Sequence, residues 1–265
     1  MTREHWLSLD EPSVELSSLR WALVVLAVCF ACWHVMTNLL INEAPIWQNA
    51  IHFGGFAFLA SIVFPGKLFG RSNLSLDLIY GASVAAAACW VVAAESRIYE
   101  ETLAITGQSW QFNIVDWTAG LLLIFAALDF SRRVSGWVIP FLIVVSISYI
   151  VFLGKYLPGV FRTASLPIDD VLFRTIYNDE GLFGILANIS SSNIALFMIF
   201  GGFLVVSGAS DFVIEVSKVV AGRIRGGAAF VAVLSSALTG TISGSAVANT
   251  ASTGVITIPL MKSSG

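Results

Sequence analysis

The longest uncharged stretch of the chain covers residues 226–261 and reads GGAAFVAVLSSALTGTISGSAVANTASTGVITIPLM. Its 36 positions are too many for one membrane-spanning helix, which needs about 20 apolar residues, and few for two full spans and a turn, which need about 40. Its middle is rich in hydroxyl groups and glycine, and unpaired polar groups inside lipid cost several kcal/mol. Length and polar centre together predict a re-entrant helical hairpin, which enters and leaves the membrane on the same side.

The predicted hairpin enters from the cytoplasm, turns near the middle of the membrane at Ser243, Gly244 and Ser245, and returns at Pro259. Each arm is expected to be a helix of about 14 to 16 residues, which corresponds to roughly 21 to 24 Å. Irregular backbone at this depth is tolerated only where it is buried in protein or lines a wet cavity. The turn is therefore a candidate binding site.

The residue types at this turn suit two ligands. Backbone carbonyls and the hydroxyl groups of Ser243, Ser245 and Thr250 are hard oxygen ligands for Na⁺. Asn249, beside the N-terminus of the returning helix, suits an anionic group of a substrate. The alternative is ordinary packing, because small residues such as the Gly240-x-x-x-Gly244 pair also line contacts between membrane helices, and serine or threonine can bond to its own helix.

Composition places the whole chain in a membrane. Apolar residues make up 57% of the sequence and charged residues 12%, whereas a soluble domain has about 25% charged residues. The surface must therefore face hydrocarbon, and the small net charge of −3 argues against nucleic acid as a partner. The sequence has no G-x-x-x-x-G-K-[ST] motif, so it does not hydrolyse ATP through a P-loop. A membrane enzyme is disfavoured as well, because the spans hold no acidic pair and no cluster of histidines.

We predict an all-α integral membrane protein with about six transmembrane helices, an interfacial helix and the re-entrant hairpin. The predicted spans are residues 19–40, 46–64, 76–94, 115–130, 137–153 and 182–207. Residues 95–114 are expected to form a polar outer loop, and residues 166–181 an amphipathic segment along the outer interface. Residues 211–225 are expected to form an interfacial helix on the cytoplasmic side.

Basic residues set the predicted orientation. With the N-terminus in the cytoplasm, the outer segments hold only four basic residues, Arg97, Lys155, Arg162 and Arg174, and are rich in Asp and Glu. The inner segments then hold Arg3, Arg20, Lys67, Arg71, Arg132, Arg133, Lys218, Arg223 and Arg225. Basic residues concentrate on the cytoplasmic side of membrane proteins. The sequence therefore predicts a multi-pass protein of a bacterial inner membrane with a cytoplasmic N-terminus.

Several polar residues inside or beside the spans admit a plain structural interpretation. His34 and Asn38 lie one helical turn apart, and we interpret them, like His52, as polar packing residues rather than a proton relay. Asp116 suits the N-terminus of the fourth span. Asp129 is expected to pair with the arginines three and four residues later. Three further charged residues of the predicted outer loop are expected to be solvated, with contact to a docking protein as the alternative: Arg97, Glu100 and Glu101.

Several motifs of the second half resemble a known family. They are Tyr156-Leu-Pro-Gly159, Glu180-Gly-Leu-Phe-Gly184, Phe200-Gly-Gly-Phe203, and the segments 226–230, 235–249, 253–254 and 257–262. Together they resemble the fused permeases of tripartite ATP-independent periplasmic (TRAP) transporters, in the branch served by TAXI-type binding proteins. Residues 1–154 are similar only in the number and order of spans.

The resemblance implies a division and a function. Residues 1–134 look like the small four-helix membrane subunit, and residues 135–265 like the N-terminal part of the large transport subunit. The family imports organic acids that an extracytoplasmic solute-binding protein delivers, uses a Na⁺ gradient and no other cofactor, and moves its site by an elevator motion. Carried onto this chain, the first hairpin supplies part of the site through Ser243, Gly244, Ser245, Asn249 and Thr250, with Na⁺ at Ser243, Ser245 and Thr250.

The sequence departs from the family in length. The family's large subunit continues into more spans and a second, inverted hairpin, whereas this sequence stops at Gly265. The expectation is a fragment or a truncated product. The alternative function is a membrane scaffold that does not transport, for which Ser243→Ala or Asn249→Ala would change nothing measurable.

Overall fold

The computed structural model describes residues 14–40, 45–63, 74–104, 110–221, 226–243, 250, 253–254, 257–259 and 261–262. The regular structure of these residues is helical throughout, as predicted. The chain divides into two compact units, residues 1–192 and residues 193–265. The predicted boundary at 134/135 concerns likeness to two subunits, and it stays a prediction.

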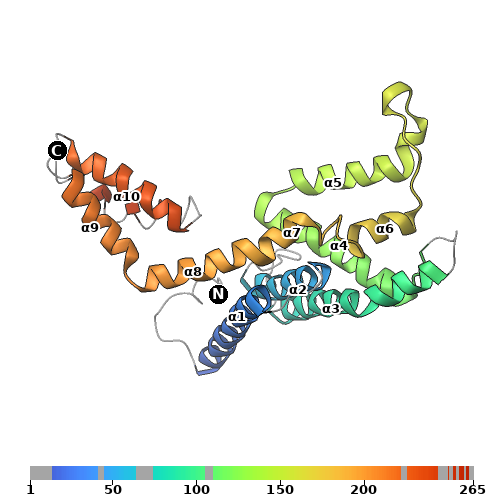
Figure 1. The fold of residues 1–265 in the computed structure, drawn as a ribbon, viewed down its shortest axis with the longest axis horizontal. Helices are drawn as coiled ribbons and strands as arrows, with labels where there is room; N and C mark the ends of the chain where they lie inside the picture. Colours follow the sequence, from blue (N-terminus) through green and yellow to red (C-terminus); the bar gives the residue numbers. More distant parts are fainter. Residues whose placement is uncertain are drawn as a thin grey trace. The chain divides into compact units, whose positions relative to one another are not determined.

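The first unit is built on long helices. It contains α1 (Val14–Leu40), α2 (Pro45–Val63), α3 (Leu74–Ala104), α4 (Ile114–Ser135) and α5 (Val138–Ser148), and α2, α3 and α4 each pack against the next helix in sequence (Figure 1). Two shorter helices follow, α6 (Ile168–Ile176) against α4 and α7 (Ile185–Ile189) against α2.

In the described part of the chain, five helical segments are long and apolar enough to cross a membrane: Trp21–Leu40, Leu74–Glu101, Ile114–Ser135, Val138–Tyr156 and Ile185–Leu204. They correspond to five of the six predicted spans. The predicted second span is the 19-residue helix α2, which carries Gln48, Asn49 and His52 in its first half and is not among these five segments. Only 11% of the Trp21–Leu40 window is buried, so this segment presents its apolar side chains outward, as lipid contact requires.

Small residues bring α2 and α3 close together. A Cβ atom added at Gly54 would lie 2.8 Å from the Cβ atom of Ala88, and one added at Gly81 would lie 2.3 Å from the hydroxyl oxygen of Ser61. Membrane helices approach most closely through such small residues, because lipid provides no hydrophobic force between helices. The backbones of α2 and α3 therefore lie close together at these glycines.

The predicted outer loop at 95–114 is wrong over its first half, because α3 continues as a helix to Ala104. Two features explain the longer helix. Ile98 is completely buried, and Arg97 pairs with Glu101 one turn later at 2.9 Å. Residues 110–113 lead into α4 without helix, and residues 105–109 lie outside the described residues.

The amphipathic segment predicted at 166–181 contains the short helix α6, but its apolar face does not lie in the lipid interface. Leu172, Phe173 and Ile176 are buried in the core of the first unit, and the ring of Phe173 stacks on Trp110 with the ring centroids 3.3 Å apart. The apolar face of α6 is buried against protein, so it does not need contact with lipid.

The span that begins with α5 ends in an irregular way. A π-helical turn, η2 (Tyr149–Leu153), follows α5 and is followed by the 3₁₀ turns η3 (Gly154–Tyr156) and η4 (Gly159–Phe161). The carbonyl group of Ile150 accepts a hydrogen bond from the backbone N–H of Leu166 at 3.3 Å, and the carbonyl group of Val151 accepts one from the hydroxyl group of Ser165. The returning chain thus binds the irregular end of its own span.

The second unit contains the end of the π-helical segment η5 (Ser190–Ile194), then α8 (Ala195–Val206), α9 (Ala209–Ala221) and α10 (Gly227–Ser243). The helix α9 matches the predicted helix at 211–225 and packs against α10 (Figure 1). Gly208 and Gly226, at φ +83° and +77°, begin the turns into these two helices, in a backbone conformation that only glycine adopts readily.

Candidate functional site

The first arm of the predicted hairpin begins as the helix α10. The structure describes this helix over 17 residues, Gly227–Ser243, and its apolar part over Gly227–Thr241. Ser243 is the first residue of the predicted turn, and residues 244–249 lie outside the described residues. The described helix is therefore a minimum length for the arm, and the turn stays a prediction.

The predicted site residues are only partly described. Ser243 is the last residue of α10, and Thr250 is helical and exposed. Gly244, Ser245 and Asn249 lie outside the described residues. Whether these five residues come together at one site therefore stays a prediction.

Buried hydroxyl groups accompany this arm. Ser235 donates to the carbonyl group of Val231 on its own helix at 2.6 Å, and Thr257 donates to the carbonyl group of Thr253 at 2.9 Å. Thr239 differs, because its side chain is 4% exposed and its hydroxyl group has no hydrogen-bond partner among the described residues. A buried hydroxyl group without a partner is unfavourable in an apolar environment. Thr239 lies one helical turn before Ser243, so the unsatisfied group adjoins the predicted site.

A second polar site lies inside the first unit, where α1, α2 and the segment 183–191 meet. Nε2 of His34 and Nδ1 of His52 are 2.7 Å apart, and Nε2 of His52 lies 3.0 Å from the hydroxyl oxygen of Ser190. Asn38 and Gln48 donate to the carbonyl group of Ser191 at 3.1 and 3.3 Å. We name these residues, together with Asn49, the α1–α2 polar cluster.

Asn49 fixes the same segment from the centre of the α1–α2 polar cluster. Its side chain is completely buried, donates to the carbonyl group of Phe183 at 2.8 Å, and accepts a hydrogen bond from the hydroxyl group of Ser191 at 2.6 Å. As the packing interpretation predicts, His34, Asn38 and His52 contact other polar groups, and their partners come from three elements. Sequence spacing shows which residues share one helix, and it cannot show that a distant segment supplies Ser190 and Ser191.

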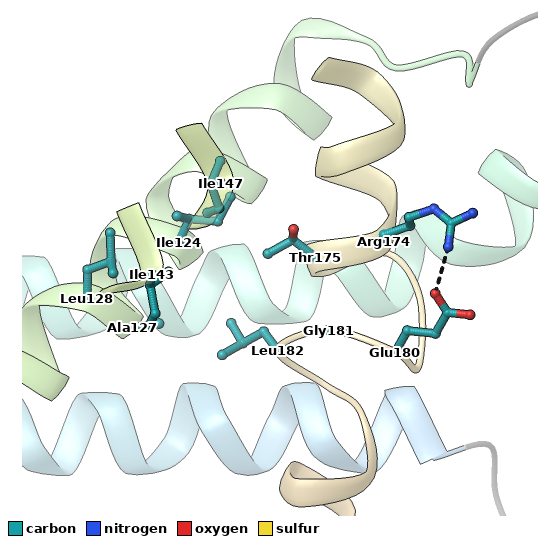
Figure 2. Close-up of a pocket in the computed structure, with 10 residues that line it drawn as sticks. All are labelled: Ile124, Ala127, Leu128, Ile143, Ile147, Arg174, Thr175, Glu180, Gly181 and Leu182. Carbon is teal, nitrogen blue, oxygen red and sulfur yellow. Dashed lines mark hydrogen bonds and ion pairs between the residues drawn. The ribbon is translucent and has the colours of Figure 1, made fainter. Parts of the chain in front are cut away.

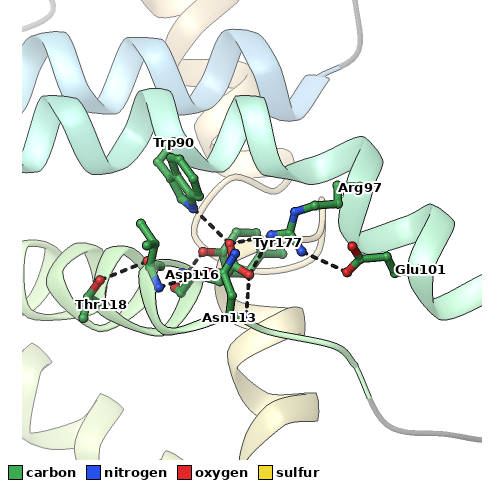
Figure 3. Close-up of polar contacts among 8 residues, drawn as sticks. Trp90, Arg97, Glu101, Asn113, Asp116, Thr118 and Tyr177 are labelled. Atoms are coloured by element: carbon green, nitrogen blue, oxygen red, sulfur yellow. Dashed lines mark hydrogen bonds and ion pairs between the residues drawn. The ribbon is translucent and has the colours of Figure 1, made fainter.

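A third polar cluster surrounds Asp116, whose side chain is completely buried at the start of α4 (Figure 3). One nitrogen of Arg97, Nη2, lies 2.7 Å from both carboxylate oxygens, and the indole N–H of Trp90 donates to the same carboxylate at 2.9 Å. Asn113 and Asp116 also form a capping box, with each side chain accepting a backbone N–H of the other residue. The predicted role of Asp116 at the helix N-terminus is confirmed.

Arg97 is therefore not a solvated loop charge, and this correction has a physical reason. A buried carboxylate needs a charged partner and further hydrogen bonds, and α3 extends far enough to supply Arg97. The phenol of Tyr177 completes the cluster by donating to the backbone carbonyl of Asp116 at 2.7 Å. Burial raises the pKa of Tyr177 above its ordinary value, and the nearby Asp116 carboxylate raises it further. Tyr177 therefore stays a hydrogen-bond donor.

Figure 2 shows an apolar crevice of the first unit with a volume of about 470 Å³. Its walls come from α4, α5, α6 and the segment after α6: Ile124, Ala127, Leu128, Ile143, Ile147, Arg174, Thr175, Glu180, Gly181 and Leu182. Arg174 and Glu180 form an ion pair at 3.1 Å. The crevice contains none of the predicted site residues. At the other end of α4, Asp129 pairs with Arg132 at 2.7 Å and with Arg133, as predicted.

Comparison with known proteins identifies the family. Residues 121–265 match the family described as "Tripartite ATP-independent periplasmic transporter, DctM component". The chain belongs to this family. It is also 38% identical over 72 residues to a "Putative TRAP transporter large permease protein" of Haemophilus influenzae (strain ATCC 51907 / DSM 11121 / KW20 / Rd). That stretch is 27% of this chain and 17% of the relative. No solved structure matches significantly.

The extent of the family match shows what the α1–α2 polar cluster and the cluster around Asp116 have in common. The DctM component belongs to a transporter rather than an enzyme. Its matched region begins inside α4 and includes Tyr177, Ser190 and Ser191, whereas His34, Asn49 and Arg97 precede it. The cluster around Asp116 and the α1–α2 polar cluster therefore both join the N-terminal helices to the DctM region by hydrogen bonds. The predicted TRAP resemblance is confirmed for the large permease component.

Proposed function

We propose that this chain belongs to a Na⁺-coupled secondary transporter that imports an organic acid delivered by an extracytoplasmic solute-binding protein. The observation that carries the proposal is the DctM match over residues 121–265, which includes α10 and the hydroxyl-rich stretch after it. The substrate class and the coupling ion follow from the family resemblance. The binding-protein partner, of the TAXI type, belongs to the same proposal.

The site that we propose for Na⁺ and the substrate is the hairpin turn, with Ser243, Gly244, Ser245, Asn249 and Thr250. Two features support it. The uncharged stretch 226–261 is too long for one span and short for two, so its hydroxyl-rich middle belongs at membrane depth. The arm also carries, at Thr239, a buried hydroxyl group that has no partner among the described residues. Within the site, Ser243, Ser245 and Thr250 supply oxygen ligands to Na⁺, and Asn249 binds the acid group of the substrate.

The proposed organisation follows the same resemblance. Residues 1–134 correspond to the small membrane subunit and residues 135–265 to the N-terminal part of the large one. The protein lies in a bacterial inner membrane with its N-terminus in the cytoplasm, in accord with the distribution of basic residues. The polar contacts between α1–α2 and residues 183–191 support a joined arrangement of the two parts, because such contacts align helices in lipid.

The test is transport by proteoliposomes that contain the permease bearing this chain. Uptake of a radiolabelled acid is expected only when Na⁺, the binding protein and the acid are all supplied. Ser243→Ala and Asn249→Ala are each expected to reduce apparent Na⁺ or substrate affinity about tenfold, the equivalent of about 1.4 kcal/mol. Thr241→Ala is the matched control, because the exposed hydroxyl group of Thr241 bonds to the carbonyl group of Leu238 on its own helix.

Two results would overturn the proposal. Uptake that persists without Na⁺ or without the binding protein would contradict the coupling. Equal uptake by the wild type, the Ser243→Ala variant and the Asn249→Ala variant would favour a scaffold that does not transport. A loss of uptake with Thr241→Ala as large as that with Ser243→Ala would show that the effect comes from helix packing rather than from the site.

A further inference from the structure

The rings of His34 and His52 form a hydrogen-bond chain with a defined direction. Nδ1 of His34 lies 2.8 Å from the carbonyl oxygen of Phe30, which can only accept a hydrogen bond, so this nitrogen carries a hydrogen. In a neutral ring Nε2 then accepts, and Nδ1 of His52 donates to it across 2.7 Å. By the same reasoning Nε2 of His52 accepts from the hydroxyl group of Ser190 at 3.0 Å. Every ring nitrogen is satisfied with both histidines neutral.

The same chain accommodates one added proton without losing a partner. When His34 is charged, both its nitrogens donate, so Nδ1 of His52 becomes the acceptor. Nε2 of His52 then carries the hydrogen and donates to Ser190, whose hydroxyl oxygen changes from donor to acceptor. A second proton does not fit. Both nitrogens across the 2.7 Å contact would then carry hydrogens, and two positive charges would face each other.

Aromatic rings enclose the pair. Phe30 and Trp33 have ring centroids 4.5 and 4.7 Å from that of His34, and the ring of Phe56 lies 4.7 Å from that of His52. His34 is 2% exposed, so little solvent reaches the pair. One charge shared between the two rings costs less to bury here than two separate charges.

The other groups near the pair are neutral in the described residues. The described hydrogen bonds of the two rings go to Phe30, to each other and to Ser190, and include no carboxylate, lysine or arginine. On α2 the polar neighbours are the amides of Gln48 and Asn49, and α3 meets α2 at Gly54 through alanines. The titratable group that faces each histidine is the other histidine. Glu43, between α1 and α2 in sequence, lies outside the described residues.

We propose that His34 and His52 together form a binding site for one proton, shared between the two rings. Binding reverses the direction of the hydrogen bond at Ser190, the first residue of the π-helical segment η5 in the DctM region. The pair therefore makes the contact between the N-terminal helices and the DctM region sensitive to pH. This site is separate from the proposed hairpin site, and its test does not depend on transport.

The first measurement is a proton count on the purified permease in lipid nanodiscs, titrated from about pH 8 to about pH 4, a range that contains the ordinary titration of histidine. The wild type is compared with His34→Gln, His52→Gln and the double variant, and circular dichroism checks that each is helical. The wild type is expected to take up one proton more than the double variant. Each single variant is expected to take up no more than the double variant, because neither ring binds the proton without its partner.

Independent sites give a different count, because each single variant would then keep its remaining histidine's proton. That result would overturn the proposal. Equal uptake by the wild type and the double variant would overturn it too, since no proton would be bound at the pair.

The second measurement needs no substitution and so remains informative if a variant fails to fold. Nitrogen-15 NMR of histidine-labelled wild type at high pH is expected to show His34 and His52 with hydrogen on Nδ1 and a bare Nε2. A hydrogen on Nε2 of His34 at high pH would overturn the assignment.

Ser190→Ala is expected to shift proton uptake to lower pH, because the charged pair then lacks its acceptor. Ser192→Ala is the matched control, since that hydroxyl group bonds to Asn188 on its own helix; an equal shift in both variants would overturn the role of Ser190.

Discussion

The buried polar side chains of the two units have hydrogen-bond partners at different separations in sequence. In the first unit, Asn49 bonds to Phe183 and Asn38 bonds to Ser191, so helices far apart in sequence are joined. In the second unit, the buried hydroxyl groups of Ser217 and Ser235 bond to carbonyl groups four residues earlier on their own helices. Polar contacts between helices align them in lipid, where hydrophobic attraction between helices is absent. The difference indicates polar cross-links between helices in the first unit, whereas the hydroxyl groups of Ser217 and Ser235 in the described part of the second unit bond within their own helices.

The largest effect is expected at Asp116. Asp116→Ala leaves the guanidinium of Arg97 and the indole of Trp90 without their carboxylate, and because Asp116 is buried while Arg97 is 33% exposed, the cost is expected near the lower end of that for a buried pair, about 3 kcal/mol. The measurement is the free energy of unfolding of the permease in detergent micelles. Glu101→Gln is the matched control, because it removes the exposed partner of the same arginine and is expected to cost less than about 1 kcal/mol. Equal effects of the two variants would contradict a buried framework contact.

An intermediate effect is expected at Asn49. Asn49→Leu removes the donor to Phe183 and the acceptor for Ser191, with an expected loss of about 1 to 2 kcal/mol. Thr37→Val is the control, because buried Thr37 bonds within its own helix, to Trp33. The same unfolding measurement compares them. If Thr37→Val proves as destabilising as Asn49→Leu, contacts between helices are not what distinguishes the first unit.

A smaller effect of opposite sign is expected at Thr239 in the second unit. Thr239→Val keeps the shape of the side chain and removes a buried hydroxyl group that has no partner among the described residues, so stability is expected to rise by about 1 kcal/mol. Thermal unfolding measures the change. A loss of stability of the same size would show that the hydroxyl group has a partner in the folded protein.

The smallest effect is expected at Ser235. Ser235→Ala removes a hydrogen bond that stays within α10, where the backbone carbonyl keeps its place in the helix, so the change is expected to be below about 0.5 kcal/mol. Hydrogen exchange of the α10 amides would detect a local effect that unfolding misses. A change above about 1 kcal/mol would place Ser235 in a contact between helices, and the contrast between the units would fail.

The sequence predicted most of the helices because hydrocarbon imposes a strong constraint on composition and length. It misjudged positions where protein contacts decide the structure. Arg97 was assigned to a loop because its charge suggested solvent, whereas Asp116 holds it on the extended α3. The apolar face of α6 was assigned to lipid, whereas Phe173 and Ile176 are buried in the core.

The candidate sites show the same limit. The uncharged length of residues 226–261 predicted a helix in the first arm, and α10 is described there over Gly227–Ser243, because length and composition can be read from the local sequence. The α1–α2 polar cluster could not be predicted in full. Its signals were the one-turn spacings of His34 with Asn38 and of Gln48 with His52, and the third partner comes from more than a hundred residues away. Helical periodicity carries no information on such distant pairing.

The π-helical turn Tyr149–Leu153 also governs how the chain tolerates changes in length. A π turn holds one more residue than an α turn, and each residue turns an α-helix by about 100°. Deleting one residue there would let the turn close as a regular α turn, so the segments on either side of it would keep their alignment. The same deletion inside the regular helix α5 would rotate everything beyond it by about that angle relative to α4, against which α5 packs. A single-residue deletion is therefore expected to be milder within Tyr149–Leu153 than within Val138–Ser148.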